Sequence, residues 1–144
     1  MIVLAADHKG YELKEEIKKF FNNENILTID VGTYSPDSVD YPDFAALANK
    51  KVLESPNNVG IYICYTGIGM SMSANRNPKI RAALCSNKTT AALSRRHNDA
   101  NVLVLPAKVV SKNKAISIIK EFLTVDFEGG RHQKRVKKLE KTKF

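Results

Sequence analysis

The chain has 144 residues, of which 43% are hydrophobic and 26% are charged, and it contains no tryptophan. This length and composition predict a single globular domain over residues 1–144, large enough to bury a core. No apolar run approaches the roughly 18 residues that span a bilayer, and the N-terminus lacks the basic region of a signal peptide. We therefore expect a cytoplasmic protein with no membrane contact, whose two cysteines are free thiols.

The formal net charge of +8 is concentrated at the C-terminus. Residues 131–144 contain seven Lys or Arg residues and one Glu, whereas the other 130 residues carry 16 basic and 14 acidic groups. A basic tail suits RNA or DNA, but it equally suits a solvated helix end or an anionic substrate. Because the body lacks the interleaved aromatic and basic residues of RNA-binding modules, nucleic acid is not favoured as a partner.

Short apolar runs alternate along the chain with longer stretches of helical period. The predicted strands cover residues 2–6, 26–31, 59–64, 80–85 and 101–105, and the predicted helices cover residues 11–21, 43–53, 70–75, 88–96, 112–123 and a basic C-terminal stretch at 130–144. Continuous apolar strands that alternate with amphipathic helices are typical of a parallel sheet covered on both faces. The sequence therefore predicts an α/β fold, a three-layer doubly wound (Rossmann-like) sheet of five mainly parallel strands with a C-terminal helix.

Polar residues follow the ends of several predicted strands. Asp7 and His8 follow the first strand, Cys64 ends the third, and Lys108 comes soon after the fifth. Ligands of open α/β sheets bind at the carboxyl ends of the strands, so these side chains form a candidate site. His97 ends the helix before the fifth strand, and we expect it at or near the same edge. Asp7 equally suits the N-cap of the first helix, and His97 suits a cation at a helix C-terminus.

Cys64 is followed by a short glycine loop that contains Gly67 and Gly69. A buried cysteine at a strand end is more often a packed small residue, as we expect for Cys85. A Gly-x-Gly turn that opens a helix, however, presents free N–H groups that favour an anion and would lower the pKa of a nearby thiol. The glycine spacing does not match a dinucleotide fingerprint, no P-loop lysine follows, and no His–Cys spacing matches zinc. We therefore expect no nicotinamide cofactor, no nucleotide hydrolysis and no zinc site of that spacing.

The C-terminal stretch carries a second candidate site. Arg131 and Arg135 lie four residues apart, so they share one face of the predicted helix. Two guanidinium groups on one face suit a phosphate group, although two solvated arginines would show the same spacing.

Five separated motifs resemble the ribose-5-phosphate isomerase B family, which includes galactose-6-phosphate isomerase subunits. The motifs are AADHKGYELK at 5–14, VGTYSPDSVDYPD at 31–43, GIYICYTGIGMSMSANR at 60–76, LSRRHNDANVL at 93–103 and EGGRHQKRV at 128–136. They cover nearly the whole chain in order, which makes the resemblance more specific than any one motif.

The resemblance implies an aldose–ketose isomerase that works through an enediolate without a metal or organic cofactor. It assigns Cys64 as the base and His97 as the proton donor that assists ring opening, in a site at the interface of a homodimer, or of a tetramer. The implied substrate-binding residues are Asp7, His8, Tyr65, Thr66, Gly67, Ile68, Gly69, Asn98, Lys108, Arg131 and Arg135. The sequence departs from the family at Tyr65, where glycine is usual, and at Lys108, where arginine is common.

The leading functional interpretation is interconversion of ribose 5-phosphate and ribulose 5-phosphate, in the pentose phosphate pathway. A six-carbon sugar phosphate isomerase of the galactose- or allose-6-phosphate type is the close alternative. The alternative from another class is a non-catalytic module that binds a sugar phosphate or nucleic acid. The presence of both Cys64 and His97 favours an enzyme, while pocket depth, which the sequence does not give, separates pentose from hexose.

Overall fold

A computed structural model describes residues 1–141, and it confirms the predicted alternation of strands and helices. The strands are β1 (Ile2–Ala6), β2 (Thr28–Asp30), β3 (Val59–Cys64), β4 (Ala82–Leu84) and β5 (Val102–Pro106). The helices are α1 (Tyr11–Asn23), α2 (Tyr41–Val52), α3 (Ile68–Ala74), α4 (Lys88–Asn98), α5 (Lys112–Thr124) and α6 (Arg131–Lys141). The predicted basic helix is thus confirmed up to residue 141, and residues 142–144 of that prediction lie outside the described residues.

The sheet has five parallel strands in the order β2-β1-β3-β5-β4. Strands β2 and β4 are shorter than the predicted ranges 26–31 and 80–85, because only three residues of each pair with their single neighbour. The chain first adds β2 on one side of β1 and then places β3 on the other side. The topological switch point therefore lies between β1 and β3, which is where a ligand is expected in a doubly wound sheet.

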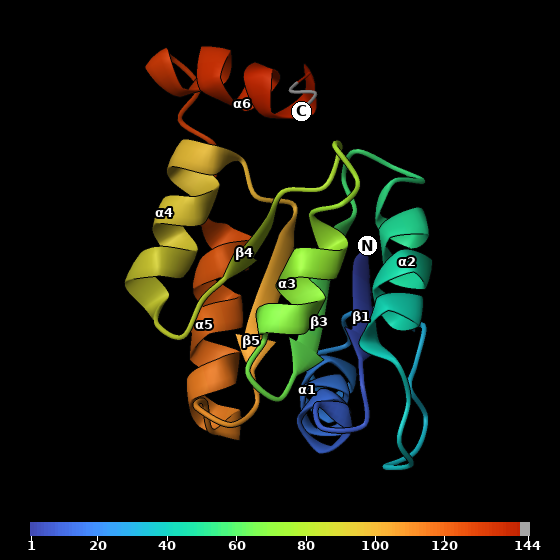
Figure 1. The fold of residues 1–144 in the computed structure, drawn as a ribbon. Helices are drawn as coiled ribbons and strands as arrows, with labels where there is room; N and C mark the ends of the chain where they lie inside the picture. The colour runs from blue at the N-terminus through green and yellow to red at the C-terminus, as the bar shows by residue number, and fades with distance from the viewer. Residues whose placement is uncertain (142–144) are drawn as a thin grey trace.

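Helices cover both faces of the sheet, which gives the predicted three layers (Figure 1). Buried residues of α1, α4 and α5, such as Ile17 and Phe122, join one apolar core, while α2 and α3 contribute to the other core with residues such as Met70. Successive residues of the central strands point into opposite cores, as Val3 and Leu4 do. Burial on both faces explains why the strand sequences are apolar throughout. None of the helices within residues 1–141 is long and apolar enough to cross a membrane.

Helix α6 lies outside these layers, beyond the amino ends of the strands and next to the C-terminal end of α4 (Figure 1). His132 and Val136 are its buried residues. An ion pair of 3.2 Å between Arg81 Nη1 and Glu140 Oε1 links the helix to the residue that precedes β4. The Arg131 and Arg135 side chains therefore belong to the amino edge of the sheet rather than to the carboxyl edge.

Candidate functional site

Asp7 and Cys64 lie at the carboxyl ends of the neighbouring strands β1 and β3 and are both buried, with exposed fractions of 7% and 4%. Asp7 Oδ1 accepts hydrogen bonds of 3.0 Å from the N–H groups of Lys9 and Gly10. The N-cap position of α1 is Gly10 and not Asp7, and the helix start has no side-chain cap hydrogen bond. Asp7 therefore fixes the turn that leads into α1, and its carboxylate stays beside the cysteine at the switch point.

Gly67 and Gly69 shape the loop that follows Cys64, each for a different reason. Gly67 has a φ of +77° and is the N-cap of α3, a conformation that glycine adopts without steric cost. A Cβ atom on Gly69 would lie 2.7 Å from the ring of Tyr41, so a side chain at this position would displace that ring. The resulting turn directs the N–H groups of Gly67, Gly69 and Met70 toward the Cys64 thiol.

The environment of Cys64 raises the pKa of its thiol above the ordinary value. Burial is the largest cause and the Asp7 carboxylate adds to it, whereas the N–H groups of Met70, Gly67 and Gly69 act in the opposite direction. The expectation that the loop lowers the thiol pKa is therefore wrong for this chain. The sequence indicates the donors correctly, but removal of the thiol from water outweighs them.

Other predicted site residues also lie at the carboxyl edge. His8 Nδ1 accepts a hydrogen bond of 3.2 Å from the N–H of Val39. The ammonium groups of Lys108 and Lys9 lie 5.1 and 5.9 Å from the ring centre of Tyr65, which is 45% exposed. The Lys108 N–H also donates to the Tyr65 carbonyl oxygen at 2.8 Å. The two positions that depart from the family thus contact each other, and the aromatic ring holds two cations beside the glycine loop.

His97 and Asn98 lie at the opposite end of the molecule, in the last turn of α4. A helix that connects parallel strands runs back along the sheet, so it ends where the next strand begins. The rise from Val102 to Pro106, the partner of Cys64, is about 13 Å. The expectation that His97 shares an edge with Cys64 is therefore wrong within one chain. The C-terminal end of α4, which contains His97 and Asn98, instead lies at the amino edge with α6 (Figure 1).

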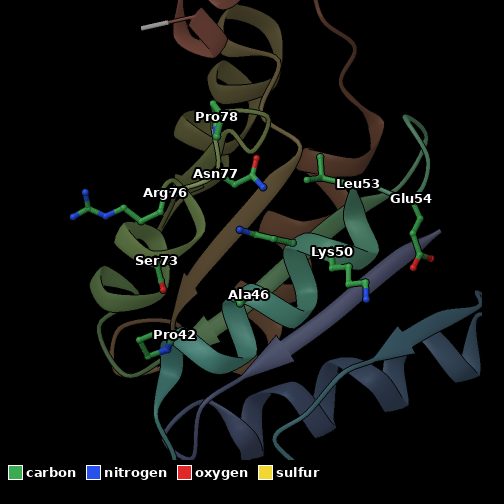
Figure 2. Close-up of a pocket in the computed structure, with 10 residues that line it drawn as sticks. Pro42, Ala46, Lys50, Leu53, Glu54, Ser73, Arg76, Asn77 and Pro78 are labelled. Carbon is green, nitrogen blue, oxygen red and sulfur yellow. The ribbon is translucent and has the colours of Figure 1, made fainter. Parts of the chain in front are cut away.

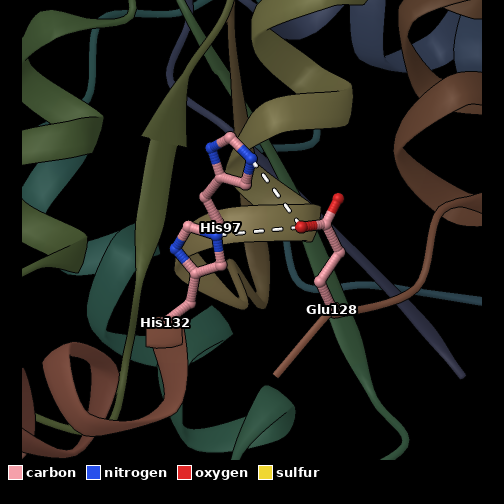
Figure 3. A group of neighbouring side chains, drawn as sticks. All are labelled: His97, Glu128 and His132. Atoms are coloured by element: carbon pink, nitrogen blue, oxygen red, sulfur yellow. Dashed lines mark ion pairs between the residues drawn. The ribbon is translucent and has the colours of Figure 1, made fainter. Parts of the chain in front are cut away.

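At the amino edge, His97 lies against two residues that the sequence did not single out. The rings of His97 and His132 stack with their centroids 4.3 Å apart and an angle of 14° between their planes. Glu128 Oε2 lies 3.7 Å from His132 Nε2 and 4.0 Å from His97 Nε2 (Figure 3). Burial, together with the positive charges of His97 and Arg131, lowers the pKa of His132. The i,i+4 spacing of Glu128 and His132 was a signal, but their proximity to His97 depends on the tertiary fold.

A surface cavity of about 650 Å³ lies elsewhere, between α2 and α3. Figure 2 shows the side chains of Lys50, Ser73 and Arg76 around it. None of the residues that line this cavity is a predicted site residue. The groups suited to chemistry are therefore divided between the carboxyl and amino edges, and the cavity is not the candidate site.

Comparison with known proteins shows the family of the chain. Residues 2–139 match the family model of the Ribose/Galactose Isomerase family. The chain belongs to this family. A putative sugar phosphate isomerase of Rickettsia bellii is 48% identical over 139 residues, which are 96% of each chain.

Solved structures of the family resemble this chain closely. The crystal structure of a ribose 5-phosphate isomerase from Thermotoga maritima superimposes with a TM-score of 0.95 at 44% identity, over 98% of this chain and 97% of that one. The ribose-5-phosphate isomerase B of Mycoplasma genitalium, with bound ribulose-5-phosphate, gives a TM-score of 0.92 at 41% identity, over 97% of this chain and 93% of that one. The α/β Rossmann-like fold is therefore that of the family.

Proposed function

We propose that this chain is an aldose–ketose isomerase that interconverts ribose 5-phosphate and ribulose 5-phosphate. The observation that carries the proposal is a buried cysteine, Cys64, which faces the N–H groups of Gly67, Gly69 and Met70 at the switch point of the sheet. The similarity to the ribose-5-phosphate isomerase B of Mycoplasma genitalium, whose structure contains ribulose-5-phosphate, supports this choice of substrate.

The proposed chemistry divides the reaction between a base and a set of donors. The Cys64 thiolate removes the proton from C2 of the open-chain aldose, and the resulting thiol returns a proton to C1 of the enediolate. Negative charge develops on the sugar oxygens while the C2 proton is on the thiol, and the N–H groups of Gly67 and Gly69 can stabilise it. Before C1 takes up the proton, the O2 hydroxyl proton passes to O1, which leaves the carbonyl of the ketose at C2. Because burial raises the pKa of Cys64, deprotonation of the thiol is part of the barrier. His8 and Asp7 line the same edge and position the sugar.

We further propose that two copies of the chain complete each site. In this arrangement, His97 of one copy donates the proton for ring opening, and Arg131 and Arg135 hold the phosphate of a sugar bound at the partner's carboxyl edge. The division of these groups between opposite edges of one chain supports the proposal. Ile68 and Met72, beside the glycine loop, are 49% and 62% exposed, which suits burial against a second copy. The free thiols of the described chain fit a cytoplasmic enzyme.

An isomerase assay with ribose 5-phosphate tests the proposal through a matched pair of cysteine variants. We expect Cys64→Ala to lower kcat at least about 100-fold, because a general base contributes on that scale. Cys85→Ala is the control, since Cys85 is also a buried cysteine after a strand but belongs to the core on the other face of the sheet from Cys64. Undiminished activity of Cys64→Ala would exclude Cys64 as the base. A higher kcat/KM with galactose 6-phosphate or allose 6-phosphate would overturn the pentose assignment.

A further inference from the structure

The cluster of His97, Glu128 and His132 contains the donor atoms of a metal site. One ligand atom from each side chain lies within 4.8 Å of the other two (Figure 3). Two imidazole nitrogens and one carboxylate oxygen form a set that binds Zn²⁺ and leaves a fourth position open. Imidazole ligands also distinguish Zn²⁺ from Mg²⁺ and Ca²⁺, which prefer oxygen atoms.

The backbone holds the three residues together from two separate parts of the chain. The N–H of Glu128 donates to the carbonyl oxygen of Arg96 at 3.1 Å, which fixes the glutamate beside the residue that precedes His97. The N–H of His132 donates to Gly129 O at 3.0 Å, which closes the turn between the glutamate and α6. The cluster therefore depends on the docking of α6 and not on the chance orientation of free side chains.

Small movements would bring the three groups to coordination distance. Bonds of about 2.0–2.2 Å around a tetrahedral ion place the ligand atoms roughly 3.3–3.5 Å apart. The observed distances of 3.7 and 4.0 Å to the glutamate must therefore shorten by less than 1 Å, and the imidazole nitrogens, within 4.8 Å of each other, by at most about 1.5 Å. The stacked rings must also turn, because a metal ion lies in the plane of each imidazole that binds it. His97 and Glu128 have side chains that are 37% and 53% exposed and are able to turn, whereas the buried His132 provides the fixed ligand.

We propose that His97, Glu128 and His132 bind one Zn²⁺ ion per chain and that the bound ion inhibits the isomerase. The second part rests on the proposed function, because Zn²⁺ on His97 occupies the nitrogen that would carry the proton for ring opening. Nearby Arg131 and Arg135 repel a dication and weaken its binding, which suits reversible inhibition rather than a permanent structural ion.

Isothermal titration with ZnCl₂ tests the site directly, without reference to activity. We expect the original chain to bind one equivalent of Zn²⁺. The affinity should be at least about tenfold weaker in His132→Gln, since even supporting residues of metal sites contribute that much. Glu128→Gln, which changes an exposed side chain, should lose a similar amount of affinity. Asp126→Asn, which removes an exposed carboxylate two residues from Glu128, is the charge control and should keep the affinity of the original chain. Cys64→Ala should also keep it, which excludes the thiol as the ligand.

Absence of binding, or equal affinity in His132→Gln, Glu128→Gln and Asp126→Asn, would overturn the site. A thermal melt of each variant establishes that it folds, and if His132→Gln does not, the comparison of Glu128→Gln with Asp126→Asn carries the test alone.

The inhibition is measured with ribose 5-phosphate, and the rate of each variant with Zn²⁺ is compared with the rate of the same variant without metal. We expect Zn²⁺ to inhibit the original chain reversibly with EDTA, at the concentrations that the titration gives, and to inhibit Glu128→Gln at least about tenfold less strongly.

Inhibition that persists unchanged in Glu128→Gln would refute the proposed effect on the isomerase. If the chain had no isomerase activity at all, the proposed function would fail, and the titration would still test the metal site by itself.

Discussion

The two edges of the sheet differ in how their polar groups are held. At the carboxyl edge, Asp7 and Cys64 are buried at the ends of adjacent strands, and backbone hydrogen bonds of the turns fix their surroundings. At the amino edge, His97, Arg131 and Arg135 lie on two helices, and the arginines are exposed. One edge thus provides a rigid, water-poor setting for proton transfer, and the other provides accessible groups that carry charge.

Because of this difference, neither edge of one chain contains both the proposed base and the proposed phosphate-binding arginines. In the proposed function the carboxyl edge supplies the base and the oxyanion donors, and the cations beside its glycine loop are Lys108 and Lys9, whose ammonium groups lie near the ring of Tyr65. The amino edge has the exposed guanidinium groups of Arg131 and Arg135, but Cys64 lies at the other edge. In the proposed function a second copy of the chain combines the two edges, and the predictions below test that division.

Replacement of His97 should affect the two directions of the reaction unequally. Ribose 5-phosphate is mainly a closed ring, whereas ribulose 5-phosphate has no free hydroxyl that can close a five-membered ring onto its carbonyl. We expect His97→Gln to lower kcat with ribose 5-phosphate about 100-fold, which is the scale of general acid catalysis. The kcat with ribulose 5-phosphate should fall much less. Initial rates in both directions measure the ratio. An equal loss in both directions would contradict a role confined to ring opening.

Mixed dimers test whether the two edges of different chains cooperate. Co-expression of Cys64→Ala with His97→Gln should give about half mixed dimers, each with one intact site of two, and therefore about a quarter of the original activity. The control pair is Cys64→Ala with Asp7→Ala, because both changes affect the carboxyl edge and leave each mixed site with one defect. A site shared between chains would be refuted if co-expression of the first pair gave no more activity than the single variants. It would also be refuted if co-expression of the control pair gave more activity than its single variants.

The sequence predicted the fold better than the site, for physical reasons that particular residues make clear. Strand β3 was predictable because it is buried on both faces, and Gly67 was recognisable because the turn needs a positive φ. The pKa of Cys64 was not predictable, because it depends on burial and on Asp7, from a strand far away in the sequence. The contact of His97 with His132 depends on the docking of α6, which local patterns do not encode.

The phosphate contact at the amino edge should depend on geometry as well as charge. Arg131→Lys keeps the positive charge but loses the planar, two-point donor, so we expect KM for ribose 5-phosphate to rise roughly tenfold with a smaller change in kcat. Lys134→Gln, which removes an exposed charge from the same helix, is the control and should change KM only slightly. If Lys134→Gln raised KM as much as Arg131→Lys, general attraction by the basic helix would account for binding instead.

The smallest expected effect concerns the thiol at the carboxyl edge. Because the Asp7 carboxylate helps to raise the pKa of Cys64, Asp7→Asn should lower that pKa, while the retained side-chain oxygen can still accept from Lys9 and Gly10. Burial is the larger cause and persists, so the midpoint should stay above the ordinary value of 9.0. Thiolate absorbance against pH, in a Cys85→Ala background that leaves one cysteine, measures the shift. A midpoint that stays the same or rises in Asp7→Asn would show that the carboxylate does not act on the thiol, and would leave burial alone to set the pKa at this edge.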